Sequence, residues 1–350
     1  MTSPFNPTWR HLKSAAFSLE ENSTAGHTLR FPLWGRDVEV YANANLSLYS
    51  AQPCNARCAF CVEELRPASR GTALTLQKRV ESDDGRYFAR LEETLRALKP
   101  LNPSVSMTGG EVSLDPRLPQ MLRLVKQYEG RKRTLTTNGS GLLRIQDGQD
   151  ILQHILEGGL AHLNISVAHP DPERSARLMR LPTLLTEAAL REIAQRTQAG
   201  GTRLRLSCVL LQEGVRGLEE MRQYLAFATR LGVDNVIFRQ LMQVDMNTVE
   251  ENFVTRYSAR QRVMLEPLLN TLDETPGFER VRQVMGYYYY VEVWRVNGMD
   301  VVFEEADLAR LEESKRLHPE RIHELIFHPN GRLCSTWQPW DGVLGPPEVA

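Results

Sequence analysis

The sequence predicts an α/β fold built around a sheet of parallel strands, and two observations support this prediction. Between residues 45 and 242, six short apolar segments with the character of strands alternate with segments whose apolar residues recur at helical spacing. Each strand-like segment also ends where a loop begins. A parallel sheet, open or closed as a barrel, carries its chemistry at the carboxyl ends of its strands. We therefore expect functional residues in those loops.

A hairpin is expected before the repeat, because residues 28–41 alternate apolar and polar side chains around Gly35 and Arg36. One helix of the repeat has an expected stop at Gly130. The predicted strands are residues 45–53, 103–111, 133–139, 162–169, 203–211 and 235–242, and the helices between them are 86–99, 118–130, 150–159, 183–201 and 217–232.

The character of the sequence changes after about residue 250. Residues 258–272 have helical spacing, and residues 286–308 read as a hairpin that turns at Asn297-Gly298, a pair suited to a type I′ turn. Residues 324–337 read as a second pair of strands. We therefore predict three regions: an N-terminal hairpin extension (1–44), the repeated core (45–250) and a C-terminal α+β region that caps the core (251–350).

Composition excludes several classes of function. The 350 residues include 42 Lys and Arg against 43 Asp and Glu, so a net charge of -1 gives no overall field that would attract nucleic acid or an anionic membrane. The first residues lack the pattern of a secretory signal, and no apolar run approaches the roughly 18 to 20 residues that span a bilayer. An odd count of five cysteines argues against a disulfide framework. A cytoplasmic location is expected, with no nucleic-acid or membrane partner.

Three of those cysteines lie within eight residues, in the stretch CNARCAFC, as Cys54, Cys58 and Cys61. Thiolates are ligands of zinc and of iron–sulfur clusters. Structural zinc takes four ligands, commonly in two pairs, whereas Cys208 and Cys334 are single and distant. The simplest reading is a [4Fe–4S] cluster with three protein-bound irons and one iron left open for catalysis. A structural zinc site and a chance grouping of buried cysteines are the alternatives.

With Phe60, the spacing C-x3-C-x-aromatic-C resembles the cluster motif of the radical S-adenosylmethionine (SAM) superfamily. The resemblance implies that the strands form a partial (β/α)6 TIM-like barrel. It also implies that SAM binds the open iron and is cleaved to methionine and a 5′-deoxyadenosyl radical, which abstracts hydrogen from a substrate. An external reductant such as flavodoxin or ferredoxin would supply the electron, and the exposed cluster would be oxygen-sensitive. The backbone of Phe60 would cover the edge of the adenine.

Gly109, Gly110 and Glu111 end the second strand of the repeat, where the family has a Gly-Gly-Glu motif that binds the methionine amino group of SAM. The glycines would let the cofactor approach the backbone, and the carboxylate would accept from the ammonium. On its own, such a triplet is equally typical of a simple strand-to-helix turn.

The next two strand ends carry Asn138 and Ser166, which the resemblance places at the ribose and carboxylate of SAM. This chain departs from the family after Ser166, because Ala168 and His169 stand where many relatives have Asp and Gly. His169 is therefore a candidate for substrate contact or for a structural hydrogen bond. In the strand of residues 203–211, the apolar groups that would stack on adenine are Val209 and Leu211.

Four polar residues near strand ends are candidates for substrate contact and catalysis. Arg239 is the sharpest of them, because a buried Arg requires an anionic partner, which could be a substrate carboxylate or phosphate or a protein Glu. The four candidates are Glu64, His169, Glu213 and Arg239.

The C-terminal region has one cysteine, Cys334, whereas peptide-modifying relatives commonly carry extra clusters there. This difference favours a single-cluster enzyme that acts on a small molecule, such as a sugar nucleoside or another anionic metabolite, by decarboxylation, elimination, rearrangement or epimerisation. The tail resembles enzymes of the cytosylglucuronate decarboxylase type, from the biosynthesis of nucleoside antibiotics, which are natural products. Residues 287–290, four tyrosines, would form a stacking wall for a nucleobase or simply pack in a sheet. A peptide-modifying enzyme and a non-catalytic zinc-binding structural protein are the alternatives.

Overall fold

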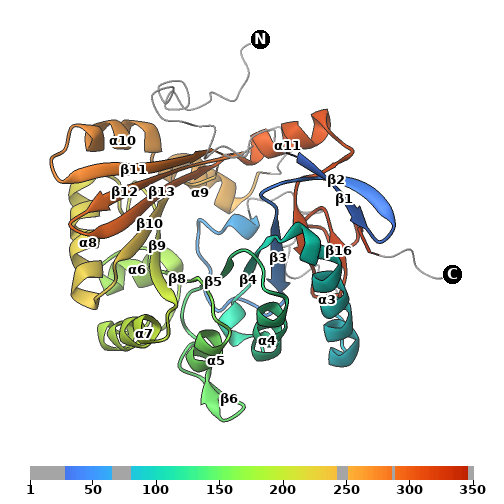
Figure 1. Cartoon of the computed structure of the whole chain (residues 1–350). Coiled ribbons are helices and arrows are strands. Elements are labelled where there is room, and N and C mark those ends of the chain that lie inside the picture. The colour runs from blue at the N-terminus through green and yellow to red at the C-terminus, as the bar shows by residue number, and fades with distance from the viewer. Residues whose placement is uncertain (1–27, 65–79, 243–250, 286–287, 346–350) are drawn as a thin grey trace.

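The computed structural model describes residues 28–64, 80–242, 251–285 and 288–345. Six strands form its centre, all parallel and in the order in which they follow along the chain (Figure 1). The predicted α/β class and the six predicted strands are confirmed, each strand ending slightly earlier than expected. The strands are β3 (Asn45–Ser50), β4 (Ser104–Gly109), β5 (Arg133–Thr137), β8 (His162–Ser166), β9 (Arg203–Val209) and β10 (Asn235–Arg239).

Helices cover the outer face of this sheet, and side-chain caps fix where several of them begin. Asp83, Asp150 and Thr186 each accept a hydrogen bond from a backbone N–H in the first turn of the helix that follows. The second helix ends at Tyr128, two residues before the predicted stop at Gly130, because Glu129 adopts the left-handed conformation. The helices predicted here are α3 (Asp84–Leu98), α4 (Leu118–Tyr128), α5 (Ile151–Glu157), α7 (Glu187–Ala199) and α8 (Leu218–Leu231).

One further helix, α6 (Pro172–Met179), was not predicted from the sequence. Pro172 occupies its first position and the Asp171 side chain caps it, which are favourable residues at a helix start. Its apolar residues are too few to give a clear periodic signal. The helix matters because Met179, at its end, contacts the cysteine loop, as described below.

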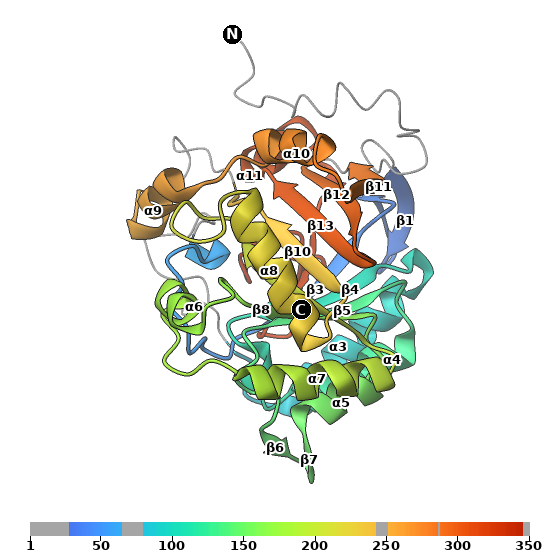
Figure 2. The same ribbon diagram turned by 90° about the vertical axis from the view of Figure 1, so that its left-hand side faces the viewer.

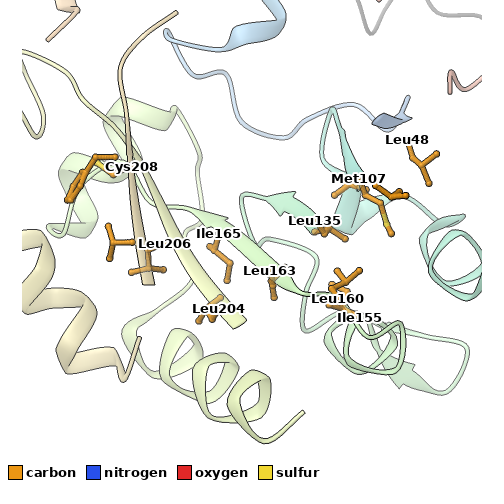
Figure 3. Packing of buried hydrophobic residues seen from close by; sticks show 14 of the residues in the cluster. Leu48, Met107, Leu135, Ile155, Leu160, Leu163, Ile165, Leu204, Leu206 and Cys208 are labelled. Carbon is orange, nitrogen blue, oxygen red and sulfur yellow. The ribbon is translucent and has the colours of Figure 1, made fainter. Parts of the chain in front are cut away.

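Alternate side chains of the strands pack under the helices and form the main core (Figure 3). In β8 and β9 the core residues are Leu163, Ile165, Leu204 and Leu206, followed by Cys208, which is fully buried. Because side chains alternate across a strand, the residues between them face the opposite, inner side of the sheet. Inner-face residues from β4, β5, β8, β9 and β10 line one common cavity, so the sheet curves around it as a partial barrel. We call the enclosed space the lumen.

The C-terminal region continues this sheet on both sides. β12 (Tyr289–Val296) and β13 (Met299–Ala306) form the predicted hairpin, with positive φ at Asn297 (49°) and Gly298 (82°) as a type I′ turn requires. β13 then pairs in parallel with β10, while β15 (Leu325–Phe327) pairs in parallel with β3. The C-terminal region was predicted as an α+β extension that caps the core, and the pairing of β13 and β15 shows that it also extends the core sheet.

The remaining elements complete the two edges. β11 (Phe278–Met285), which was not predicted, is an edge strand beside β12, and β16 (Leu333–Cys334) ends the other edge. The single helix expected over residues 258–272 is two helices, α9 (Phe253–Gln261) and α10 (Leu265–Asp273). Seen from the side, α10 lies at the top of the molecule, and β11–β13 lie beside α8 and above α4, α5 and α7 (Figure 2).

The predicted N-terminal hairpin is present as β1 (Thr28–Leu33) and β2 (Arg36–Tyr41), joined by the turn residues Trp34 and Gly35. A short strand, β14 (Arg321–Ile322), pairs with β2 and makes a separate three-stranded sheet. In the part of the chain that the structure describes, no helix has the length and apolar character that crossing a membrane requires. The boundaries proposed at residues 44 and 250 stay predictions.

Candidate active site

The three clustered cysteines lie in a loop between β3 and a short 3-10 helix, η2 (Val62–Glu64). All three line one cavity of about 250 Å³ at the carboxyl ends of the parallel strands. The end of α6 holds the loop in place. The backbone carbonyl of Met179 accepts from the Arg57 N–H at 3.2 Å and from the Cys58 thiol at 3.4 Å. Burial raises the pKa of the Cys54 and Cys58 thiols above their ordinary values.

This donor set fits an iron–sulfur cluster better than a single metal ion. Within the described ranges, no three His, Cys, Asp or Glu side chains converge on one metal position. A [4Fe–4S] cluster distributes its thiolate ligands over separate irons, so its cysteines need only surround a shared space, as Cys54, Cys58 and Cys61 do. These three residues would hold the cluster. Cys208 and Cys334 are fully buried and are not among the residues that line this cavity.

Gly109 and Gly110 allow the end of β4 to approach the cysteine loop very closely. A Cβ atom on Gly109 would lie 2.4 Å from the carbonyl oxygen of Ser50, and one on Gly110 would lie 1.8 Å from that of Gln52. Gly109 also has a φ of +129°, which side chains disfavour. We predicted that these glycines make room for a cofactor. The structure gives them a second purpose, the packing of two backbone segments beside the same cavity.

The Glu111 carboxylate is almost fully buried and is surrounded by donors from the protein itself. It accepts from the Ser113 N–H (2.9 Å) and hydroxyl (2.6 Å), from the Thr137 hydroxyl, and from the Asn138 N–H (2.8 Å). Its expected role was to accept from the ammonium of SAM. In this structure the carboxylate ties the loop after β4 to the end of β5 and also borders the cavity, and its contact with SAM stays a prediction.

Asn138 and Ser166 both line the cavity, as expected for residues near SAM. The Asn138 amide donates to the Oδ1 of Asn55 at 2.8 Å, and therefore joins the end of β5 to the cysteine loop. Ser166 is the last residue of β8 and faces the lumen. Their proposed contacts with ribose and carboxylate remain predictions.

Of the three apolar residues expected near adenine, two border the cavity and one does not. Phe60 and Val209 line it. Leu211 is fully buried in a smaller apolar cluster beside the cysteine loop, with Ala59 and Met179 among its members. β9 ends at Val209, so the alternation that would have carried Leu211 to the lumen stops there.

Arg239 lines the cavity, and its guanidinium pairs with a protein carboxylate, Glu304 of β13, at 3.2 Å. From the sequence, the anion beside Arg239 could be a substrate group or a protein Glu, and in the structure a protein Glu lies there. Glu304 also faces the lumen and was not a candidate, because only the parallel pairing of β13 with β10 brings it opposite Arg239.

The other candidates for substrate contact lie elsewhere. Glu213 accepts from the Tyr257 hydroxyl on α9 and is outside this cavity. His169 borders a second cavity, of about 310 Å³, which shares Asn138 and Ser166 with the first. Its Nδ1 accepts from the Asp171 N–H at 2.9 Å, and burial lowers its pKa.

Glu64 lies in η2, and its side chain is outside the described residues, as is Tyr287. Its neighbour Glu63, which we did not predict, is buried, borders the cavity and accepts from the Tyr49 hydroxyl at 2.6 Å. Tyr290 of the tyrosine run is buried and donates to Glu292 at 2.5 Å, so this ring packs in the sheet as the simpler reading held.

Comparisons with known proteins agree with this geometry. Among curated proteins, a GTP 3′,8-cyclase of Stenotrophomonas maltophilia (strain K279a) is 30% identical over 235 residues, which is 64% of this chain and 62% of that protein. A GTP 3′,8-cyclase of Aquifex aeolicus (strain VF5) is 26% identical over 199 residues, covering 57% of this chain and 56% of that protein. The chain thus spans less than two thirds of the length of these relatives.

Among solved structures, SuiB of Streptococcus suis bound to precursor peptide SuiA superposes with a TM-score of 0.50 and 15% identity, covering 95% of this chain and 65% of SuiB. At that identity the likeness concerns the fold alone. The family model named Radical SAM superfamily matches residues 49–237, more than half of the chain. Together with the three-cysteine cavity, this match shows that the chain belongs to the radical SAM superfamily and is an enzyme whose cofactors are a [4Fe–4S] cluster and SAM.

Proposed function

We propose that this enzyme removes a hydrogen atom from a small anionic molecule bound in the lumen. When bound, the cluster and SAM supply the 5′-deoxyadenosyl radical, and the protein decides which C–H bond that radical meets. The observation that carries the proposal is the single cavity that the three cysteines share with the Arg239–Glu304 pair. Cofactor and substrate positions are therefore contiguous.

The wall of this cavity suits a polar substrate. Thr108, Thr136 and Ser207 line it from β4, β5 and β9, so their hydroxyls can bind hydroxyl or carbonyl groups of a substrate. Leu241 and Met242 form an apolar part of the wall beside the Arg239–Glu304 pair. Arg239 can donate to a substrate anion with the guanidinium nitrogens that its partner leaves free.

The cysteine inventory supports a single cluster and, with it, a redox-neutral reaction. Cys208 and Cys334, the two cysteines outside the motif, are buried in the core, so they supply no second cluster in the described part of the chain. We propose decarboxylation, elimination, rearrangement or epimerisation, with flavodoxin or ferredoxin as the reductant and with sensitivity to oxygen. The curated relatives are named for GTP, which favours a nucleotide or sugar nucleoside as substrate. A tailoring role in natural-product biosynthesis, as in the cytosylglucuronate decarboxylase type, is consistent with this class.

The experiment is a substrate panel under anaerobic conditions. Reconstituted, dithionite-reduced enzyme is incubated with SAM and with nucleotides, sugar nucleosides, uronates or short peptides, and 5′-deoxyadenosine is measured by mass spectrometry. A substrate deuterated at the reacting carbon should transfer deuterium into 5′-deoxyadenosine. Acceleration and deuterium transfer by an anionic small molecule support the proposal. Acceleration by peptides alone would assign the enzyme to the peptide-modifying group instead.

A further inference from the structure

Several nitrogen-bearing side chains gather at the floor of the lumen, at the amino ends of β5, β8 and β9. His162 and Arg205 alternate with the core residues Leu163, Leu204 and Leu206, so they face the lumen. Lys132 precedes β5, two residues before the inner-face Thr134. These residues are far from the cysteine loop, which lies at the opposite ends of the same strands.

Arg282 of β11 faces the same space from the other side. It is paired with Val293 of β12, which is in turn opposite Val302 on the inner face of β13. The positive charges of Arg205 and Arg282 both lower the pKa of Lys132, after the larger effect of burial. The three cations therefore lie close enough to feel one another.

These three cations differ from their neighbours in having no carboxylate partner. Arg203 pairs with Asp300 at 2.7 Å and Arg239 pairs with Glu304 at 3.2 Å. Among the described residues, no carboxylate forms an ion pair with Lys132, Arg205 or Arg282, and Arg205 donates through its Nε to the neutral amide of Asn235. Lys132 and Arg282 are exposed, whereas Arg205 is partly buried. Burial without an ion-pair partner is costly for Arg205 and lowers its pKa to about 10, although the negative charges of Glu304 and Asp300 act in the opposite direction. An anionic ligand would relieve that cost.

Two further polar atoms at this level also lack a partner. Asn164 is 5% exposed, and its Oδ1 accepts no hydrogen bond while its amide donates to the Thr136 hydroxyl at 3.2 Å. The Nδ1 of His162 is buried and unpartnered among the described residues. Burial lowers the pKa of His162 to about 3, so its ring is neutral at pH 7 and can donate or accept. Because Thr136 borders the catalytic cavity, Asn164 connects the floor to it.

From this arrangement we propose that the floor of the lumen binds the phosphate group of the substrate, through Lys132, Arg205 and Arg282. The proposal rests on the proposed function and narrows its substrate class to phosphate esters. A phosphate dianion can satisfy several cations at once, and the fork of Arg and the point charge of Lys are both established phosphate ligands. A monocarboxylate would leave most of the positive charge uncompensated.

The distance along β9 from Arg205 to the catalytic cavity sets the expected length of the substrate. Val209 borders the catalytic cavity, and Arg205 lies four residues earlier on β9, which corresponds to about 13 Å at ~3.3 Å per residue. A substrate with its phosphate on the floor and its reacting C–H bond near the cysteine loop would be about as long as a nucleoside monophosphate.

The test is the binding of inorganic phosphate to the cluster-reconstituted full chain, by calorimetry under anaerobic conditions at constant ionic strength. Acetate serves as the carboxylate comparator. We expect phosphate to bind the wild type more tightly than acetate does. We expect Arg205→Gln and Lys132→Met each to weaken phosphate binding at least tenfold, and Arg205→Lys to retain most of it. Arg216→Gln, which removes an exposed Arg paired with Glu220 on the surface, should bind phosphate as the wild type does.

Three outcomes would overturn the proposal: no phosphate binding by the wild type, equal binding by Arg205→Gln and wild type, or acetate binding as tight as that of phosphate. Thermal unfolding of each variant without phosphate identifies any that has failed to fold. Arg282→Gln then takes its place, because Arg282 is exposed on the edge strand β11, and it should weaken phosphate binding in the same way. Because phosphate binding is measured without SAM or reductant, its result is independent of whether the enzyme forms 5′-deoxyadenosine. The two proposals can therefore fail separately.

Discussion

Glu111 is a buried carboxylate that joins two loops beside the cofactor cavity. Its four protein donors come from the loops after β4 and β5. In Glu111→Gln, one oxygen becomes an NH2 group that faces N–H and O–H donors, so the two loops should separate. We expect a loss of about 1 to 3 kcal/mol in the free energy of unfolding and weaker SAM binding. Chemical denaturation and equilibrium dialysis with labelled SAM measure the two effects. Unchanged SAM affinity and stability would show that the hydrogen bonds of Glu111 contribute to neither.

The Arg239–Glu304 pair calls for a double-mutant cycle, because each partner is about one third exposed and a single substitution leaves the other charge behind. For Arg239→Met, Glu304→Gln and the double variant, we expect a coupling energy of ~1 kcal/mol in the free energy of unfolding, reduced by solvent screening. Urea denaturation of the wild type, the two single variants and the double variant measures this coupling energy. Strictly additive effects would mean that the pair does not interact in solution.

Local spacing in the sequence led to several residues that the structure brings together, and the roles predicted for them stay predictions. The three cysteines, Phe60, Val209 and Arg239 border one cavity as proposed. Leu211 does not, because its strand ends two residues earlier, and the end of a strand is set by neighbours that are distant in sequence. Glu304 was missed for the related reason that its position depends on the pairing of β13 with β10.

At the scale of elements, the strand–helix repeat was predictable because each unit is local and strongly periodic. The parallel pairing of β13 and β15 with the core was not, since a hairpin looks the same in sequence whether it stands alone or extends a sheet. α6 was not predicted, because a short helix with a narrow apolar side gives little periodic signal.

The contact between the end of β4 and the cysteine loop leads to a prediction at this scale. In Gly110→Ala, the new Cβ would collide with the Gln52 carbonyl, so the loop must move. We expect iron content and the cluster absorbance to fall to less than half of the wild-type values after reconstitution. Gly148→Ala is the control, because its added Cβ would meet no atom within 4 Å. Gly148 has a positive φ (84°), which Gly110 does not have, so the control carries more backbone strain than the test variant but no collision. Equal iron incorporation by Gly110→Ala and wild type would contradict the proposed packing role.

At the scale of the whole molecule, stability should depend on pH through Glu305. Burial, with the negative charges of Asp307 and Glu266 nearby, raises the pKa of Glu305 from 4.5 to about 7, against opposing contributions from Gln240 and Arg262. The folded state therefore holds this proton more tightly than the unfolded state does, so the stabilisation that Glu305 contributes is fully present below about pH 4.5 and is lost as pH rises to about 7.

Comparison of Glu305→Gln with the wild type isolates this effect. The variant should gain roughly 3 kcal/mol relative to the wild type between pH 5 and pH 8, by the conversion of ~1.4 kcal/mol per pKa unit. Urea denaturation across this range supplies the comparison. A difference between the two proteins that is the same at every pH would refute the assignment.

The central claim is that the CNARCAFC loop holds a cluster that cleaves SAM. The most direct measurement is 5′-deoxyadenosine, detected by mass spectrometry after anaerobic reconstitution with iron and sulfide, reduction with dithionite and addition of SAM. We expect the wild type to form this nucleoside and the Cys54/Cys58/Cys61→Ala variant to form none. Absence of both the brown cluster and the nucleoside from the wild type would contradict the claim, as would equal formation of the nucleoside by the two proteins.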